Sequence, residues 1–147
     1  MILVAGATGL LGSEICSRLR AQGRAVRAMA RTGSEPDKVA AIPSMGAATA
    51  IADLKDPASL ARACEGVETV VSTASSTISR QQGDSIETVD RLGQLNLVEA
   101  KHAGVTRFIY VSVPTRRCPM EMNETQTLLP RRLTTVQDYA AAARRNT

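Results

Sequence analysis

The chain alternates between two patterns of hydrophobic positions, one typical of buried β-strands and one typical of helices with a single apolar face. Short apolar runs rich in Val, Ile and Ala are separated by longer segments in which apolar residues recur every three or four positions. The short runs predict five strands, at Ile2–Ala5, Ala25–Ala30, Ala48–Ala52, Val67–Thr73 and Val105–Val113. The longer segments predict four helices, at Leu10–Gln22, Pro36–Met45, Pro57 to about Cys64, and Ser85–Ala103.

The residues at the helix ends support this division. A glycine, which commonly ends a helix, follows each predicted helix: Gly23, Gly46, Gly66 and Gly104. Asp56 directly precedes Pro57, so an N-cap side chain is followed by a proline at the first helical position. In the first helix, Leu11, Ile15 and Leu19 are expected to form the buried face.

Strands that alternate with helices pair in parallel, because helical crossovers connect parallel neighbours, and these crossovers are right-handed. We therefore predict an α/β fold, a doubly wound parallel sheet of the Rossmann-like type, with five strands in the order 3-2-1-4-5. In this architecture a ligand binds at the switch point beside the first strand.

The pattern changes after Val113. Glycine is absent from residues 114–147, three prolines interrupt that segment, and arginines occur in pairs. We expect one folded domain over 1–113 and an irregular tail over 114–147. Within the tail, Thr134 and Gln137 have the spacing of a capping box and predict a last helix over 135–145.

The first predicted strand runs directly into glycines at positions 6, 9 and 12. Gly6 allows a sharp turn, Gly9 removes a Cβ where the backbone approaches a phosphate, and Gly12 lets the helix lie close to the strand. The free N–H groups and the positive dipole end of the helix then face an anion. With a strand before it and a helix after it, the motif predicts a site for a dinucleotide pyrophosphate. A strand–turn–helix that binds nothing is the alternative.

Arg31 ends the second predicted strand, where NAD sites carry an acidic residue that binds the ribose hydroxyls. A guanidinium pairs with a 2′-phosphate and stacks on adenine. Arg31 therefore favours NADP(H), with Lys38 as a second positive charge. NAD(H) and an ordinary solvated arginine remain the alternatives.

Two further pairs of residues follow predicted strands. Asp53 and Leu54 come after the third strand and would flank the adenine, with Asp53 accepting from the exocyclic amine or simply starting a turn. Ala74 and Ser75 come after the fourth strand. Their small side chains would let the nicotinamide ribose lie against the backbone, unless they form only a serine-rich loop.

Five short sequence blocks, in a fixed order along the chain, carry a resemblance to a known family. They are Gly6–Gly12, Val26–Arg31, Ala52–Asp56 with Ser59 and Leu60, Gly66–Val71, and Gly104–Ser112. Together they resemble the atypical short-chain dehydrogenase/reductase families and are most similar to the NmrA-like, NAD(P)H-binding group. The resemblance covers residues 1–113 and implies an NAD(P)-binding Rossmann domain there. It implies either an oxidoreductase of small carbonyl or quinone substrates, or a catalytically silent NADP(H) sensor that regulates partner proteins.

By position, the resemblance implies that Thr8, Gly9, Leu10 and Leu11 contact the pyrophosphate, mostly through the backbone, and that Arg31 takes the adenosine ribose phosphate. It also implies two borders of the site, Asp53 and Leu54 at the adenine, and Ala74 and Ser75 on the nicotinamide side.

The catalytic residues stay unassigned. Proteins of this kind commonly use a Tyr-x-x-x-Lys pair, in which the tyrosine protonates the developing alkoxide. Here Tyr110 is followed four residues later by Pro114, and Tyr139 by Ala143. Ser112 lies where a family serine often lies, although a simple strand-end hydroxyl is the plainer interpretation.

The last two strands and the substrate region usual in the family are also missing from the chain. Three explanations compete: a truncated or frame-altered form of a longer reductase, a compact cofactor-binding protein, or a fragment that completes its sheet with a partner. Because the fifth strand would leave an open edge, self-association is one expectation.

Composition excludes several other classes. Aromatic residues make up 2% of the chain, which argues against binding of single-stranded nucleic acid by base stacking. The net charge of +4 arises mostly in residues 114–147, which hold six arginines and three acidic residues. The three cysteines are far apart, so we expect free thiols, buried at Cys16 and Cys64, and no metal site. With neither a signal peptide nor a membrane-spanning segment evident, we expect a cytoplasmic protein.

Overall fold

A computed structural model describes residues 1–77, 79, 81–100 and 104–111 of the chain. Its centre is a sheet of five parallel strands in the order β3-β2-β1-β4-β5. The strands are β1 (Ile2–Ala5), β2 (Val26–Ala30), β3 (Ala48–Ile51), β4 (Thr69–Ser72) and β5 (Arg107–Tyr110). The predicted fold class and strand order are both confirmed.

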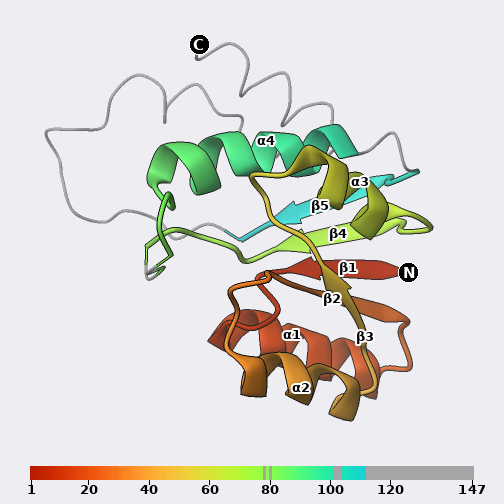
Figure 1. Cartoon of the computed structure of the whole chain (residues 1–147). Helices are drawn as coiled ribbons and strands as arrows, with labels where there is room; N and C mark the ends of the chain where they lie inside the picture. Colours follow the sequence, from red (N-terminus) through yellow and green to blue (C-terminus); the bar gives the residue numbers. More distant parts are fainter. Residues whose placement is uncertain (78, 80, 101–103, 112–147) are drawn as a thin grey trace, which may run out of the picture.

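Helices cover both faces of the sheet (Figure 1). One layer contains α1 (Leu10–Ala21) and α2 (Pro36–Ser44), and the other contains α3 (Pro57–Cys64) and α4 (Leu92–Glu99). A π-helical turn, η1 (Ile86–Arg91), leads directly into α4. The cap predicted for α3 is present, since the Asp56 side chain accepts a hydrogen bond from the Ala58 N–H.

The core lies in two apolar layers, one on each face of the sheet. Successive β1 side chains alternate between the layers, with Leu3 packed in the α3–α4 layer and Val4 in the α1–α2 layer. Cys16 of α1 and Cys64 of α3 are fully buried free thiols, as predicted. Burial raises the pKa of each to about 11.

The pairing register of β1 with β2 and β4 places the carboxyl ends of these three strands side by side. Ala5 of β1 pairs with Met29 of β2 on one side and with Ser72 of β4 on the other. The loops that follow these strands therefore meet at the carboxyl edge of the sheet, around the switch point beside β1.

Three sequence predictions need correction. Leu11 does not face the core: it is exposed, and α1 fully buries Gly12 and Cys16. The other two residues of the predicted face, Ile15 and Leu19, are partly buried and pack against the core as predicted. The predicted helix Ser85–Ala103 is an N-cap at Ser85, then η1, then α4. Strands β4 and β5 are both shorter than predicted, as β4 starts at Thr69 and β5 at Arg107.

The described residues contain no helix with the length and hydrophobicity needed to cross a membrane. The predictions for Ser112, Cys118, the tail over 114–147 and its helix over 135–145 lie outside the described residues.

Candidate functional site

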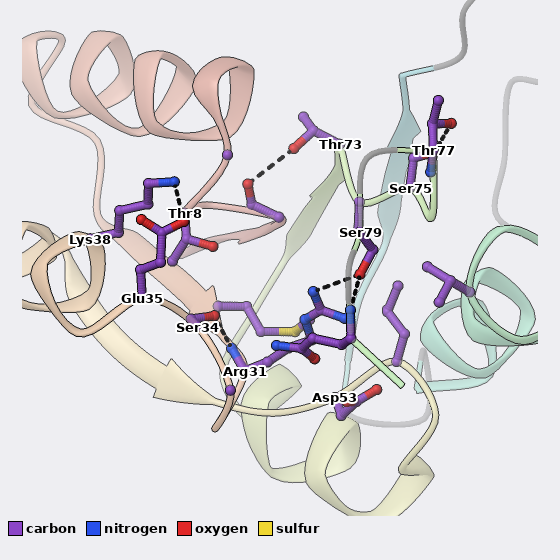
Figure 2. Close-up of a pocket in the computed structure, with 18 residues that line it drawn as sticks. Thr8, Arg31, Ser34, Glu35, Lys38, Asp53, Thr73, Ser75, Thr77 and Ser79 are labelled. Atoms are coloured by element: carbon purple, nitrogen blue, oxygen red, sulfur yellow. Dashed lines mark hydrogen bonds and ion pairs between the residues drawn. The ribbon is translucent and has the colours of Figure 1, made fainter. Parts of the chain in front are cut away.

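A cavity of about 720 Å³ opens at the carboxyl edge of the sheet, where the loops after β1, β2, β3 and β4 meet (Figure 2). This volume is in the range of small-molecule and cofactor sites. Eight of the residues predicted to bind a dinucleotide line it: Gly6, Thr8, Gly9, Arg31, Asp53, Leu54, Ala74 and Ser75. Tertiary structure thus brings together residues that are up to 69 positions apart in the sequence.

The β1–α1 loop is shaped by two glycines. Gly6 has φ +78°, and a Cβ there would lie 2.9 Å from the backbone nitrogen of Ala74. A Cβ at Gly12 would lie 2.1 Å from the carbonyl oxygen of Gly6. Both positions therefore require glycine for the fold itself, whatever the loop binds.

Gly9 differs from these two. Its φ of −83° suits any residue, and the sole contact for an added Cβ, within 4 Å, would be the Gly6 oxygen at 3.2 Å. That contact is tight but far longer than the one at Gly12, so the fold requires glycine less strongly at this position. Gly9 also lines the cavity.

The N-terminus of α1 beside Gly9 carries no side-chain cap and no acidic residue in its first turn. The Ser13 N–H makes the first intrahelical bond, to the Gly9 oxygen at 2.9 Å. The preceding N–H groups of Leu10, Leu11 and Gly12 consequently have no acceptor within the helix. Such a terminus attracts an anion through its N–H groups and the helix dipole.

Arg31 also lines the cavity and is held by an acidic residue of the chain. Its Nη1 donates to Oδ2 of Asp84 at 2.5 Å, and Nη2 lies 3.5 Å from Oγ of Ser79. Lys55 pairs with the other carboxylate oxygen, Oδ1. The Asp84 side chain is 1% exposed, compared with 29% for Arg31.

Burial of Asp84 raises the pKa of its carboxyl group, but hydrogen bonds from Lys55, Ser79 and Arg31, together with the Arg31 charge, more than compensate. The resulting pKa lies well below the usual range for aspartate. Asp84 is therefore ionised at neutral pH, and Arg31 faces a full negative charge.

The predicted adenine border is a turn packed on a helix. The Lys55 N–H donates to Oδ1 of Asp53 at 2.8 Å, so Asp53 does start a turn while it lines the cavity. Leu54 is 3% exposed, and a Cβ at Gly93 of α4 would lie 2.8 Å from its Cβ. Leu54 thus offers the cavity a rigid apolar edge.

The opposite border follows β4. The Thr73 hydroxyl donates to the Ala5 oxygen at 3.1 Å, which ties this loop to the end of β1. The buried side chain of Gln94 donates to the Ala74 oxygen at 3.0 Å. The Ser75 hydroxyl lies 2.8 Å from that of Thr77. These bonds fix Ala74 and Ser75 where small side chains leave room beside the backbone.

Three predicted residues lie outside this lining. Leu10 is 94% exposed and borders a smaller cavity between α1 and α2, whereas Leu11 and Gly12 line neither cavity. None of the three therefore borders the larger cavity directly.

Sequence reasoning missed the polar residues of the loop between β4 and η1. Ser79 and Gln81 line the cavity, and Asp84 anchors Arg31. The signal that could have found them is positional, because a polar loop that follows a central parallel strand must end at the same edge as the glycine loop. Lys38, predicted as a second cation, lines the cavity and pairs with Glu35 at 2.7 Å.

No tyrosine lines the cavity in the described part of the chain. Tyr110 is in β5, where burial and, secondarily, the charge of Asp90 raise its pKa. No residue of the described segments is therefore assigned a catalytic role.

Comparison with known families matches this geometry. A family model described as NAD(P)H-binding covers residues 6–146. The chain belongs to this NAD(P)H-binding family. The predicted resemblance to the NmrA-like and short-chain dehydrogenase/reductase group is thereby confirmed.

Two relatives have names that describe different roles. The chain is 40% identical over 113 residues to sterol demethylase protein B of Methylococcus capsulatus, a match that covers 75% of this chain and 33% of that protein. It is 33% identical over 115 residues to a photosystem II assembly factor of Synechocystis sp., with coverage of 76% and 33%. The chain thus spans about a third of the length of these relatives.

Solved structures of the superfamily share the fold. A short-chain dehydrogenase/reductase superfamily protein of Agrobacterium tumefaciens with bound NAD has a TM-score of 0.60 and 30% identity, over 76% of this chain and 32% of that chain. An NADPH-dependent quinone oxidoreductase of Escherichia coli has a TM-score of 0.57 and 27% identity, over 77% and 35%. The neighbours therefore include users of both coenzymes.

Proposed function

We propose that this chain binds NADP(H) in the cavity at the carboxyl edge of the sheet, with NAD(H) as the weaker ligand. The diphosphate would lie against the N–H groups of Thr8, Gly9, Leu10 and Leu11, at the start of α1. The single observation that carries the proposal is Gly9, the least sterically constrained of the three motif glycines, which lines the cavity at the uncapped N-terminus of α1.

The two ends of the coenzyme have different surroundings in this proposal. The adenosine would lie between Arg31 and the edge formed by Asp53 and Leu54, and Arg31 would take the 2′-phosphate. The nicotinamide side would lie along Ala74 and Ser75. Support comes from the shared lining of one cavity by all five residues.

Thermal unfolding with NADPH, with NADH and with neither tests this proposal. A ligand present at about one hundred times its dissociation constant adds about 2.7 kcal/mol to the free energy of unfolding. We expect a larger rise in melting temperature with NADPH than with NADH. The variant Gly9→Ala should fold, as its melting curve without ligand will show, but should lose most of the rise. No rise with either coenzyme on folded protein would refute the proposal.

The wider activity is proposed in two forms. The first is an NAD(P)H-dependent oxidoreductase acting on small carbonyl or quinone compounds, since the chain is similar to an NADPH-dependent quinone oxidoreductase. The coenzyme would supply the hydride, and this chain would orient it and exclude water from the nicotinamide side. NADPH oxidation assayed with a panel of quinones and aldehydes tests this form.

The second form is a non-catalytic NADP(H)-binding protein that acts through partners. Two observations favour it. The sequence given contains no Tyr-x-x-x-Lys pair, and one relative is an assembly factor. Coenzyme binding without NADPH oxidation above background supports this form, whereas turnover supports the oxidoreductase.

A further inference from the structure

Asp84 forms ion pairs with two cationic side chains, Arg31 and Lys55, beside the part of the cavity that we propose holds the adenosine. Its Oδ2 accepts from Nη1 of Arg31 at 2.5 Å and from the Ser79 hydroxyl, while Oδ1 accepts from Lys55. Each oxygen of this buried carboxylate therefore accepts from a cation of another loop, and Oδ2 also accepts from Ser79 of its own loop. The cation proposed to receive a 2′-phosphate is already paired with an anion of the chain.

The loop that carries Asp84 lies against the loop after β2. Ser79 and Gln81 line the same cavity as Arg31, as the close-up of Ser79 beside the Arg31 guanidinium illustrates (Figure 2). A Cβ at Gly33 would lie 2.6 Å from Nε2 of Gln81. A phosphate that reaches Arg31 from the cavity must therefore share or replace its contact with Asp84.

Charge makes this sharing unfavourable. Arg31 and Lys55 together bring two positive charges, and Asp84 cancels one of them. A 2′-phosphate would bring further negative charge beside a carboxylate that is 1% exposed, and like charges at close range repel strongly where water is scarce. NAD(H) carries a hydroxyl at the same position and meets no such repulsion.

We propose that Asp84 is a specificity-determining residue for the coenzyme: its carboxylate competes with the 2′-phosphate for Arg31 and so narrows the preference for NADP(H) over NAD(H). This inference depends on the proposed function, because the competition exists only if the adenosine ribose lies beside Arg31. Asp84 lies 53 positions from Arg31 in the sequence. No sequence motif therefore links the two residues.

Titration calorimetry with NADP⁺ and with NAD⁺ tests the competition in Asp84→Asn. We expect the Kd for NADP⁺ to fall by about tenfold or more, which corresponds to about 1.4 kcal/mol, while the Kd for NAD⁺ changes by less than about twofold. Glu68→Gln is the matched control, because it removes one exposed negative charge just before β4, at the opposite edge of the sheet. It should leave the ratio of the two Kd values unchanged.

The double variant tests whether the effect of Asp84→Asn acts through Arg31. In Arg31→Ala the gain produced by Asp84→Asn should shrink, because the main recipient of the phosphate is gone. A gain of unchanged size in that background would overturn the proposal. Should Asp84→Asn fail to fold by circular dichroism, Asp84→Ser provides a second neutral side chain with the same expectation.

The outcomes separate the two proposals. If folded wild-type protein binds neither coenzyme, the proposed function fails. If the wild type binds coenzyme but Asp84→Asn leaves the NADP⁺ to NAD⁺ ratio as it was, or weakens both equally, only the role of Asp84 fails.

Discussion

Gly12 and Gly6 approach each other so closely that a Cβ on Gly12 would lie 2.1 Å from the Gly6 carbonyl oxygen. The contact is between the first turn of α1 and the loop that follows β1, and an added Cβ on Gly6 would in turn meet the backbone of Ala74. Two of the three motif glycines thus serve the fold, and the third, Gly9, is the one that we propose serves the coenzyme.

The first prediction follows from this contrast. Gly12→Ala should lower the free energy of unfolding by about 2–4 kcal/mol, because a methyl group is forced into backbone at a distance that no contact allows. Gly9→Ala should cost less than about 1 kcal/mol, because its Cβ meets one oxygen at 3.2 Å. Urea unfolding of both variants provides the comparison. Equal losses would contradict the assignment of separate roles.

The second prediction concerns Arg31. Arg31→Ala should remove most of the difference between the melting temperature rises given by NADPH and by NADH, because the 2′-phosphate loses its guanidinium partner. Arg24→Ala, an exposed arginine between α1 and β2, is the control of equal charge change. A difference that survives in Arg31→Ala would show that another group selects the coenzyme.

The third prediction concerns the pH dependence of stability. The folded pKa of Asp84 is depressed below its value of about 3.9 in unfolded chains, so its ion pairs contribute fully above that value and are lost as the pH falls towards the folded pKa. Asp84→Asn should therefore destabilise the protein by about 1–3 kcal/mol at pH 7 and by less at pH 3. Urea unfolding at the two pH values measures this, and a cost that does not decline in acid would contradict it.

The fourth prediction concerns the buried thiols. Burial raises the pKa of Cys16 and Cys64 from 9.0 to about 11, so both should react slowly with a thiol reagent at pH 8 in the native state. In Cys118→Ser protein, the reagent should label two thiols per chain after unfolding in guanidinium and almost none before. Between about pH 9 and 11 the unfolded thiols release protons that the folded ones keep, so stability should decline with rising pH. Fast labelling of the folded protein would refute this.

Local pattern was enough for the architecture. The spacing of apolar residues, the glycines after helices and the Asp56–Pro57 pair predict the place and type of the five strands and four α-helices, though not the π-helical turn η1. Parallel pairing with right-handed crossovers then leaves essentially one strand order. The cavity residues that follow β1, β2 and β3 could also be predicted from the sequence, because the carboxyl ends of strands in a parallel sheet share one edge.

Tertiary structure decided what depends on distances between loops. Sequence periodicity placed Leu11, Ile15 and Leu19 on the buried face of α1. Ile15 and Leu19 do pack against the core, but Leu11 in the first turn is exposed, because the loops around that turn leave it uncovered. The pairing of Arg31 with Asp84 could not be predicted from the sequence either. A polar loop has no periodic pattern to place its side chains, and a charged residue in it has many candidate partners. Which carboxylate reaches a given cation is set by how the loops fold over the sheet edge, and only the folded backbone contains that information.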